Sequence, residues 1–587
     1  GREILSKTYD PELYRGYSTA TRRNLIRLDE AKIDYDLLEE LLMYLIENTH
    51  DGAILVFLPG AAEINRLHDV LSAAHRFRNH WILPCHSNVN PEDQRRVFHR
   101  PPEGVRKIVL STNIAETSIT IDDCVYVVDT GKVKERQYDA ARGMGLLLEG
   151  WVPKASARQR KGRAGRVRPG ECFSLYTRAR AESFQAYARP EIMRVPLEEL
   201  CLQIKLLRLG SCKDFLSKVV QPPGEAAVEA ALRTLREARA IDEEENLTAL
   251  GHHLAQLPVD CKVGRMLILS TFLGCLDPIL TIAACLSYKS PFSAPMENRD
   301  AADRARMAMS ASGSGNIASG QHSDHLTMLA AFNGWRDEQA VSGKRGGKRF
   351  SRAHFLSEST LQMISDLRAQ LAAMLADVGF IQTRRGSASR GGGRGGGGGH
   401  LWRAAQMAEA LDAPWNAHAN CAGMVKAALC AGLYPNIAVM DQVPAQIDHS
   451  KNRWFGPDGK DVALHPSSVN HGAGAPIKYP YPFIVYLEKM RTSRIFLRDT
   501  SCISPYALLL FGGALAVDHA NAAVDIDGWI TLKAPAQTAV LFKELRLALD
   551  AELQKIINQP GGSTLSTSSL MRALARLLAE EAKQVTG

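Results

Sequence analysis

The sequence predicts a multidomain protein in which an α/β domain with a parallel sheet comes first, and a mainly helical part and a small β domain follow. Three observations support this prediction. The chain has 587 residues, several times the roughly 100–200 residues of a typical domain. Up to about residue 180, short apolar runs alternate with helical patterns. Helical patterns then dominate, until a stretch rich in Val, Ile, Tyr and Phe begins near residue 418.

The α/β prediction rests on the order of elements in the first part of the chain. Residues 1–48 contain polar, extended sequence and then a leucine-rich helical pattern over 37–45. The apolar run 53–58 (AILVFL), stopped by Pro59 and Gly60, is typical of a strand buried on both faces. A helical pattern over 64–71 and short apolar runs at 82–83, 107–110 and 125–128 continue the alternation. Such alternation specifies a parallel sheet with helices on both faces.

The remaining elements follow from composition and from breaks in the pattern. Prolines at 222, 223, 258 and 291 interrupt the helical stretches between about 185 and 415, and residues 418–530 predict a small antiparallel β domain. Residues 386–399 are nearly all Gly, Ser and Arg, so we expect a flexible linker or insertion there. A last helix is expected over about 535–557. An amphipathic stretch over 570–578 follows, and we expect it to pack on its own chain rather than on a partner.

Composition excludes several classes of protein. An apolar share of 45% and a charged share of 23% exclude global disorder, collagen and coiled coil. The longest apolar run, 507–517, contains two glycines and is well short of the roughly 18–20 residues that span a bilayer. We therefore expect no transmembrane segment and no membrane partner.

The cysteines and histidines indicate a reducing compartment and no metal site. Eleven cysteines contain no Cys-x-x-Cys pair, and seventeen histidines show no His-Glu-x-x-His pattern and no spacing with cysteine that suits zinc. Free thiols favour an intracellular location. We expect the cytoplasm, with the nucleus and organelles left open.

The most informative segment is 151–170, which has seven basic residues and no acidic one. Within it, residues 159–166 read QRKGRAGR. On a helix, Arg163 and Arg166 would lie on one face because they are three residues apart. Two guanidinium groups on one face suit a polyphosphate. A solvated basic helix that meets a nucleic-acid backbone is the alternative.

A second polar segment, 111–122 (STNIAETSITID), lies between two predicted strands. Polar groups at the carboxyl end of a parallel strand lie where open α/β sheets bind ligands. Thr112 and Asn113 can donate to phosphates, and Asp122 can accept from a ribose hydroxyl. The alternative is that Ser111 or Thr112 caps a structural helix.

Taken together, four segments resemble the second RecA-like domain of superfamily 2 helicases of the DEAH-box/RNA helicase A group. They are 54–60 (motif IV), 85–98 (motif IVa, beginning CHSN), 111–122 (motif V) and 159–166 (motif VI), with YVVD at 126–129 between the last two. Within the group, residues 189–223 are most similar to the subgroup that contains the helicase assisting ribosomal scanning on structured messenger RNA. Several motifs in the correct order are strong evidence, whereas a single Gly-Arg repeat would be weak.

The resemblance implies a domain map for nearly the whole chain. Residues 1–48 would be a linker from a missing first RecA-like domain, and 49–185 the second RecA-like domain with a β-hairpin at 131–152. A winged helix would occupy 186–260, and a helical ratchet domain 261–415 with the insertion 386–399. An OB-like fold would occupy 416–532, and C-terminal helices 533–587.

The resemblance also implies roles for particular residues. Arg163 and Arg166 would be arginine fingers that stabilise charge on the transferring γ-phosphoryl group, and Gln159 would lie near that phosphate or the attacking water. Asp122 would contact the ribose of ATP, and Phe98 would stack on its base.

For the nucleic acid, the resemblance places Thr112, Asn113 and Ser87 on the RNA sugar-phosphate backbone, where contacts carry no sequence information. The implied activity is ATP-dependent RNA unwinding with 3'-to-5' translocation. The implied partners are RNA and ribosomal or other ribonucleoprotein components, or a protein that activates the helicase. The basic clusters at 151–170 and 344–352 predict weak, salt-sensitive RNA binding.

Two elements of a complete motor are not found in the sequence. There is no Gly-x-x-x-x-Gly-Lys-Ser/Thr phosphate loop and no DEAH-like run, and the chain opens GRE without an initiator Met. We expect ATP with Mg²⁺, whose ligands would lie on the first RecA-like domain. We interpret the chain as the C-terminal portion of a helicase that is inactive alone. A non-catalytic RNA-binding scaffold and a DNA helicase are the rival hypotheses.

Overall fold

A computed structural model describes most of the chain: residues 11–87, 89, 94–117, 119–140, 142–166, 168–293, 298–312, 322–381, 405–410, 412–440, 453–471, 477, 479–492, 494–560 and 568–586. Asn88 of the motif IVa segment and the insertion 386–399 lie outside these ranges. The chain forms two compact units, which we describe separately. The first comprises 1–137, 147–191 and 293–299, and the second comprises 138–146, 192–292 and 300–587.

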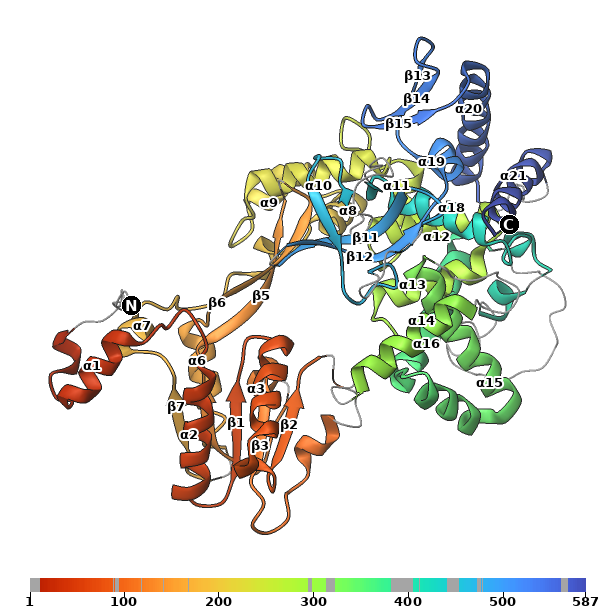
Figure 1. Ribbon diagram of the computed structural model, residues 1–587. Coiled ribbons are helices and arrows are strands. Elements are labelled where there is room, and N and C mark those ends of the chain that lie inside the picture. The colour runs from red at the N-terminus through yellow and green to blue at the C-terminus, as the bar shows by residue number, and fades with distance from the viewer. Residues whose placement is uncertain are drawn as a thin grey trace, which may run out of the picture. The chain divides into compact units, whose positions relative to one another are not determined.

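The first unit contains the predicted parallel sheet (Figure 1). Its five strands have the order β2-β3-β1-β4-β7, and every pair is parallel. They are β1 (Ala53–Phe57), β2 (Trp81–Cys85), β3 (Lys107–Ser111), β4 (Cys124–Asp129) and β7 (Glu171–Ser174). All residues of β1, β3 and β4 are buried, as continuous apolar runs in a sheet covered on both faces require.

Helices cover both faces of this sheet because successive strand side chains point to opposite sides. Ile54 and Val56 of β1 join a core with leucines of α2 (Tyr35–Asn48) and α3 (Ala61–Ala73). Leu55 and Phe57 join a second core on the other face. There the covering elements are the short helix α5 (Ile114–Thr117) and α6 (Lys154–Lys161). Helices α1 (Thr19–Arg27) and α7 (Arg178–Glu182) also belong to this unit.

The second unit begins with the winged helix. Helices α8 (Glu198–Leu206), α9 (Cys212–Ser217), α10 (Glu225–Glu237) and α11 (Ala249–Leu254) share one core. Between α10 and α11, Ile241 and Leu247 form an antiparallel bridge, so the acidic run between them is the tip of a short wing.

The ratchet region that follows is helical, as predicted. It contains α12 (Cys261–Leu273), α13 (Leu276–Ser287), α14 (Arg299–Ser312), α15 (Asp324–Ala353) and α16 (Glu358–Val378). Helix α18 (Ala422–Leu433) lies between this region and the strands of the β domain. Most residues of α12 and α13 are buried, so these helices form the centre of the largest core.

The β domain is a closed five-stranded barrel and not a purely antiparallel sheet. Its strands are β8 (Ile437–Met440), β9 (Trp454–Phe455), β10 (Asp461–Leu464), β11 (Phe483–Arg491) and β12 (Ile495–Cys502), in the ring order β12-β10-β9-β8-β11. The β11–β12 pairing closes the ring, and β10–β12 is parallel. The prediction of an antiparallel domain was wrong at this pair, because strands cannot alternate direction all the way around a ring with an odd number of members.

The expected hairpin consists of β5 (Lys132–Asp139) and β6 (Met144–Trp151), which are neighbours in the same sheet. Its tip, 138–146, belongs to the second unit. There Gly145 and Leu146 pair with Met490 and Arg491 of β11.

The C-terminal part adds α19 (Pro505–Phe511), a three-stranded sheet and two helices. The strands are β13 (Leu515–Asp518), β14 (Ala523–Ile526) and β15 (Ile530–Lys533), and the helices are α20 (Ala536–Asn558) and α21 (Ser569–Thr586). Leu574 and Leu578 of α21 are buried in the largest core, so the amphipathic stretch packs on its own chain, as expected. In the described part of the chain, no helix has the length and apolar character needed to cross a membrane.

Candidate nucleotide and nucleic-acid site

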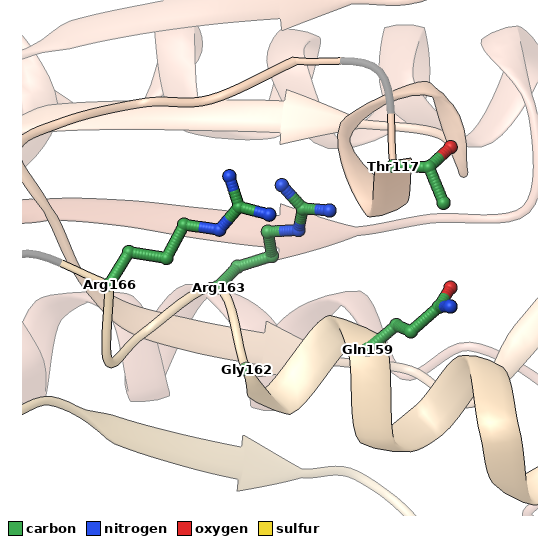
Figure 2. Close-up of a pocket in the computed structure, with 5 residues that line it drawn as sticks. All are labelled: Thr117, Gln159, Gly162, Arg163 and Arg166. Atoms are coloured by element: carbon green, nitrogen blue, oxygen red, sulfur yellow. The ribbon is translucent and has the colours of Figure 1, made fainter.

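An open pocket of about 340 Å³ lies in the first unit where α6 ends. Its lining residues are Thr117, Gln159, Gly162, Arg163 and Arg166. Figure 2 shows the two arginine side chains extending side by side from the turn after α6, with Gln159 on the helix beside them. The structure therefore brings together the three residues that the sequence predicted for γ-phosphate chemistry.

The two arginines do not share a helix face, so that part of the prediction was wrong. Helix α6 ends at Lys161, and residues 162–166, which we call the arginine turn, follow it. Glycine has low helix propensity, and this turn contains Gly162 and Gly165. Hydrogen bonds from the amides of Arg163 and Ala164 to the carbonyls three residues earlier tighten the chain here.

Contacts with α5 and with the loop between α5 and β4 direct both arginines into the pocket. Arg163 donates to the backbone carbonyls of Glu116 and Ile119. Arg166 donates from Nη1 to Thr120 Oγ1 at 2.6 Å. The end of α5 and the loop after it thus orient both guanidinium groups, although the two arginines do not share a helix face.

The two arginines differ in their access to solvent. Arg163 is only 8% exposed, whereas Arg166 and Gln159 are exposed. Burial and the neighbouring Arg166 charge lower the pKa of Arg163. An anion bound in the pocket would offset the repulsion between these two cations. Gln159 adds an amide that can donate to a phosphate oxygen and accept from a water.

Arg160 is the residue that sequence reasoning missed in this segment. It is fully buried and donates to Glu116 Oε2 at 3.2 Å, to Asp129 Oδ1 at 2.8 Å and to the Lys132 carbonyl at 3.1 Å. These bonds fix α6 against the end of β4, so they position Gln159 and the arginine turn. The sequence did contain a signal for this buried residue. Asp129 is a carboxylate directly after the apolar run 125–128, and such a carboxylate needs a partner when it is buried.

One buried ammonium group holds the chain segments of the two residues that were predicted to contact the base and the ribose. Phe98 is 54% exposed and Asp122 is also exposed. Lys107, fully buried at the start of β3, donates to the carbonyls of Val97 at 2.8 Å and His99 at 2.9 Å, on either side of Phe98. It also donates to Asp123 Oδ1 at 2.6 Å. Sequence reasoning missed Lys107, which looks like the polar first residue of a strand.

The predicted RNA contacts lie at the carboxyl edge of the sheet. Thr112 and Asn113 follow β3, and Ser87 follows the neighbouring strand β2. The Thr112 amide donates to the Cys85 carbonyl at 3.2 Å and keeps the two strand ends together. The Ser111 hydroxyl donates to the carbonyl oxygen of Cys85 or Thr112, so it does not cap a helix.

Asp122 lies elsewhere, which corrects the expectation that the whole segment 111–122 borders the carboxyl edge. It lies two residues before the start of β4 and is therefore near the amino end of that strand. The reason is topological: the chain must cross the sheet from the end of β3 to the start of the parallel strand β4. The predicted RNA residues and the predicted ribose residue consequently lie at opposite edges.

Comparisons with known protein families match five segments of the chain. The helicase conserved C-terminal domain matches residues 35–168, and the winged-helix and ratchet-like helicase associated domains match 231–259 and 260–328. The oligonucleotide/oligosaccharide-binding fold matches 425–515, and the C-terminal domain in RNA helicases matches 523–580.

Similar proteins extend over nearly the whole chain. The chloroplastic DExH-box ATP-dependent RNA helicase DExH4 of Arabidopsis thaliana is 44% identical over 566 residues, which are 94% of this chain and 39% of that protein. The human ATP-dependent DNA/RNA helicase DHX36 is 41% identical over 94% of this chain and 52% of its own length. The human ATP-dependent RNA helicase DHX29 is 39% identical over 97% of this chain and 40% of its own length.

The chain belongs to the DExH/DEAH-box family of RNA helicases. It spans about half the length, or less, of these relatives. The pocket residues Gln159, Arg163 and Arg166 all lie inside the segment that matches the helicase C-terminal domain. The DExH/DEAH-box assignment thus agrees with the parallel sheet, the winged helix and the closed barrel.

The lining of the pocket in this DExH/DEAH-box chain does not fit a resident Mg²⁺ ion. Within the described ranges, no group of three or more His, Cys, Asp or Glu side chains could hold a metal. The pocket itself is lined by cationic and neutral side chains, which suit an anion. The pocket therefore offers donors to a phosphate group rather than ligands to a metal.

Proposed function

We propose that this chain is the C-terminal part of an ATP-dependent RNA helicase and supplies its second RecA-like lobe and accessory domains. In this proposal, ATP hydrolysis drives 3'-to-5' translocation along RNA and unwinding of RNA duplexes. The observation that carries it is the pocket in which Arg163, Arg166 and Gln159 converge. Relatives whose names specify ATP-dependent RNA helicases support it.

The proposed chemistry is stabilisation of charge on the transferring γ-phosphoryl group. Arginine is suited to this task because its planar guanidinium stays charged and binds phosphate oxygens in a bidentate manner. Arg166, which is exposed, reaches the phosphate directly. Arg163 does so from the arginine turn, where its bonds to the carbonyls of Glu116 and Ile119 hold it. Gln159 orients the attacking water. Such positioned cations act mainly in the transition state, where the charge develops.

The remaining nucleotide contacts are proposed at the amino edge of the sheet. Phe98 stacks on the base, and Asp122 accepts from a ribose hydroxyl. Face stacking makes no contact with the edge of the base, so we expect a loose base preference. At the carboxyl edge, Thr112, Asn113 and Ser87 contact the RNA backbone, and this positions the strand without reading its sequence.

We propose that the chain by itself does not hydrolyse ATP. The sequence contains no phosphate loop and no DEAH-like run, and the described residues do not fit Mg²⁺. The triphosphate and its metal would be held mainly by a first RecA-like domain, so half of the site is missing here. None of the steps proposed for this chain passes through the metal.

The test is an ATP turnover assay with and without single-stranded RNA. The purified 587-residue chain should hydrolyse ATP no faster than buffer. The same chain, expressed with its natural upstream coding sequence, should show RNA-stimulated turnover. RNA-stimulated turnover by the isolated chain that Arg166→Ala abolishes would contradict the proposed inactivity. Failure of the longer protein to hydrolyse ATP would favour the non-catalytic scaffold.

DNA unwinding is a second candidate because one relative is named as a DNA/RNA helicase. The residues proposed for nucleic acid contact the backbone and do not require a 2'-hydroxyl. Strand displacement on RNA and DNA duplexes of matched sequence would separate the two activities. We expect faster displacement of RNA, and equal rates would extend the proposed substrate to DNA.

We also propose a reducing intracellular compartment. All eleven cysteines are free thiols, and nine of them are buried. Free buried thiols are typical of proteins kept in reducing surroundings. Ribosomal or other ribonucleoprotein partners, or an activating protein, remain part of the proposal for the whole protein.

A further inference from the structure

The second half of helix α15 forms a separate arm that folds back on the first half. Gly343 has φ 63° and ψ −166°, which interrupts the helix. A residue with a side chain would be strained at this positive φ. Beyond it, residues 344–353, which we call the basic arm, run antiparallel to residues 334–342.

Close contacts fix the arm in this position. The Phe350 ring lies against Gly334, where a Cβ atom would come within 2.4 Å of it. A Cβ at Gly346 would lie 2.7 Å from the Glu338 carbonyl oxygen. Glycine at these positions therefore lets the two halves approach closely. Glu358 also joins the halves, because it accepts from Trp335 Nε1 at 3.0 Å and from Ser351 Oγ at 2.8 Å.

The packing leaves one face of the arm entirely cationic. Gly346, Gly347 and Ser351 are buried against the first half of the helix. The opposite side carries five exposed cations at helical positions i, i+1, i+4, i+5 and i+8, which form one continuous stripe. They are Lys344, Arg345, Lys348, Arg349 and Arg352.

Acidic side chains of the described part of the chain neutralise little of the positive charge of this stripe. Arg349 donates to Glu338 at 3.4 Å. The structure, over the ranges it describes, gives the other four cations no ion-pair partner. Five cations so close together repel one another, and a polyanion would relieve that repulsion.

We infer that the basic arm is a docking site for the phosphate backbone of double-stranded RNA. From Lys344 to Arg352 the stripe is about 12 Å long at 1.5 Å per residue. At the phosphate spacing of B-form DNA, a duplex presents about seven phosphates over that length and a single strand about three or four. A duplex therefore supplies enough phosphates to pair with all five cations, whereas a single strand does not.

The composition of the stripe also favours a duplex. Sites for single-stranded nucleic acid combine cations with aromatic side chains on which bases stack. The exposed face of the arm has none, because Phe350 is turned inward onto Gly334. Contacts to phosphates alone give no sequence preference. The arm thus binds duplex RNA by charge, separately from the pocket in the RecA-like lobe.

The experiment measures RNA binding by the 587-residue chain without nucleotide. A quadruple variant, K344Q/R345Q/K348Q/R352Q, removes the four cations that lack a partner. A labelled blunt RNA duplex of about 20 base pairs is titrated between about 50 and 200 mM salt. The matched control, K218Q/K533Q/K543Q/R572Q, removes the same charge from scattered exposed positions. Thermal unfolding verifies that both variants fold.

The arm variant should lose about tenfold or more in duplex affinity at low salt, and its log–log salt slope should be shallower by about 2 to 4 units. The control should lose less than about twofold. Equal losses in both variants, or an unchanged duplex affinity that would point to an acidic protein surface as the ligand, would overturn the inference. An equal loss on a single-stranded oligonucleotide would overturn the choice of duplex. The inference rests on the proposed function only in taking RNA as the ligand, so a failed ATPase assay does not affect it.

Discussion

The arginine turn with its preceding helix and the basic arm have similar compositions and opposite architectures. Both combine arginine, lysine and glycine within about ten residues. In the first, Arg160 is fully buried against two carboxylates, and Arg163 is bound to two backbone carbonyls. In the second, all five cations are exposed on one helix face. Defined hydrogen bonds, including the one from the exposed Arg166 to Thr120, therefore distinguish the pocket arginines, which act through position, from the cations of the arm, which act through number.

The largest expected effect is on ATP hydrolysis and concerns the position of Arg166 in the pocket. In the assembled helicase, Arg166→Ala should lower kcat for RNA-stimulated ATP hydrolysis by about a thousandfold or more, as for other arginine fingers. Arg166→Lys should restore little, because a lysine lacks the planar fork. The control Arg168→Ala removes an exposed arginine of the same segment. A loss of similar size in that control would remove the distinction between the two arginines.

The next effect is on stability and concerns the buried residue Arg160. Arg160→Met should lower the free energy of unfolding of the first unit by about 3–5 kcal/mol, because it leaves two buried carboxylates unpaired. Arg158→Met, on the exposed side of α6, should change it by less than about 0.5 kcal/mol. Urea unfolding measures both. Equal stability of the two variants would show that burial at this position does not matter.

Lys107 should give an intermediate effect on nucleotide binding. Its loss in Lys107→Met frees the segments of Phe98 and Asp122, so KM for ATP should rise about tenfold, the equivalent of 1.4 kcal/mol. At saturating ATP, kcat should change much less. A lower kcat with unchanged KM would instead indicate a smaller folded fraction and no role in positioning. Lys154→Met, which removes an exposed lysine of the same lobe, serves as the control.

The smallest expected effect is on the arm. R345K/R352K keeps the charge and changes the geometry, so duplex RNA affinity should change by less than about twofold. The same type of substitution at Arg166 should be severe. Fluorescence anisotropy measures the first and ATP turnover the second. A large loss in the arm variant would mean that its arginines also act through defined geometry.

Much of the fold was predictable because burial leaves a direct trace in the sequence. The runs at 53–58, 107–110 and 125–128 became β1, β3 and β4, since strands covered on both faces must be apolar throughout. The parallel β10–β12 pair was not predictable, because local patterning does not encode how a barrel closes. Domain boundaries depend on the same long-range packing and remain predictions.

The candidate site was predictable in its residues but less so in its geometry. Gln159, Arg163 and Arg166 converge as expected, although the helix ends before the arginines. Arg160 and Lys107 were missed because a buried cation and a surface cation look alike in a sequence. Their burial depends on carboxylates and carbonyls that are distant in the chain, such as Asp129 for Arg160 and Asp123 for Lys107.

Strand β3 connects the two edges of the RecA-like lobe. Its first residue, Lys107, is tied to the Phe98 and Asp122 segments, and its last residue, Ser111, leads directly into Thr112 and Asn113. The strand is about 13 Å long and is hydrogen-bonded to β1 on one side and β2 on the other. It is therefore a rigid element. In the proposed function, a shift at the end of β3 near the nucleotide therefore reaches the end near the RNA without passing through any loop.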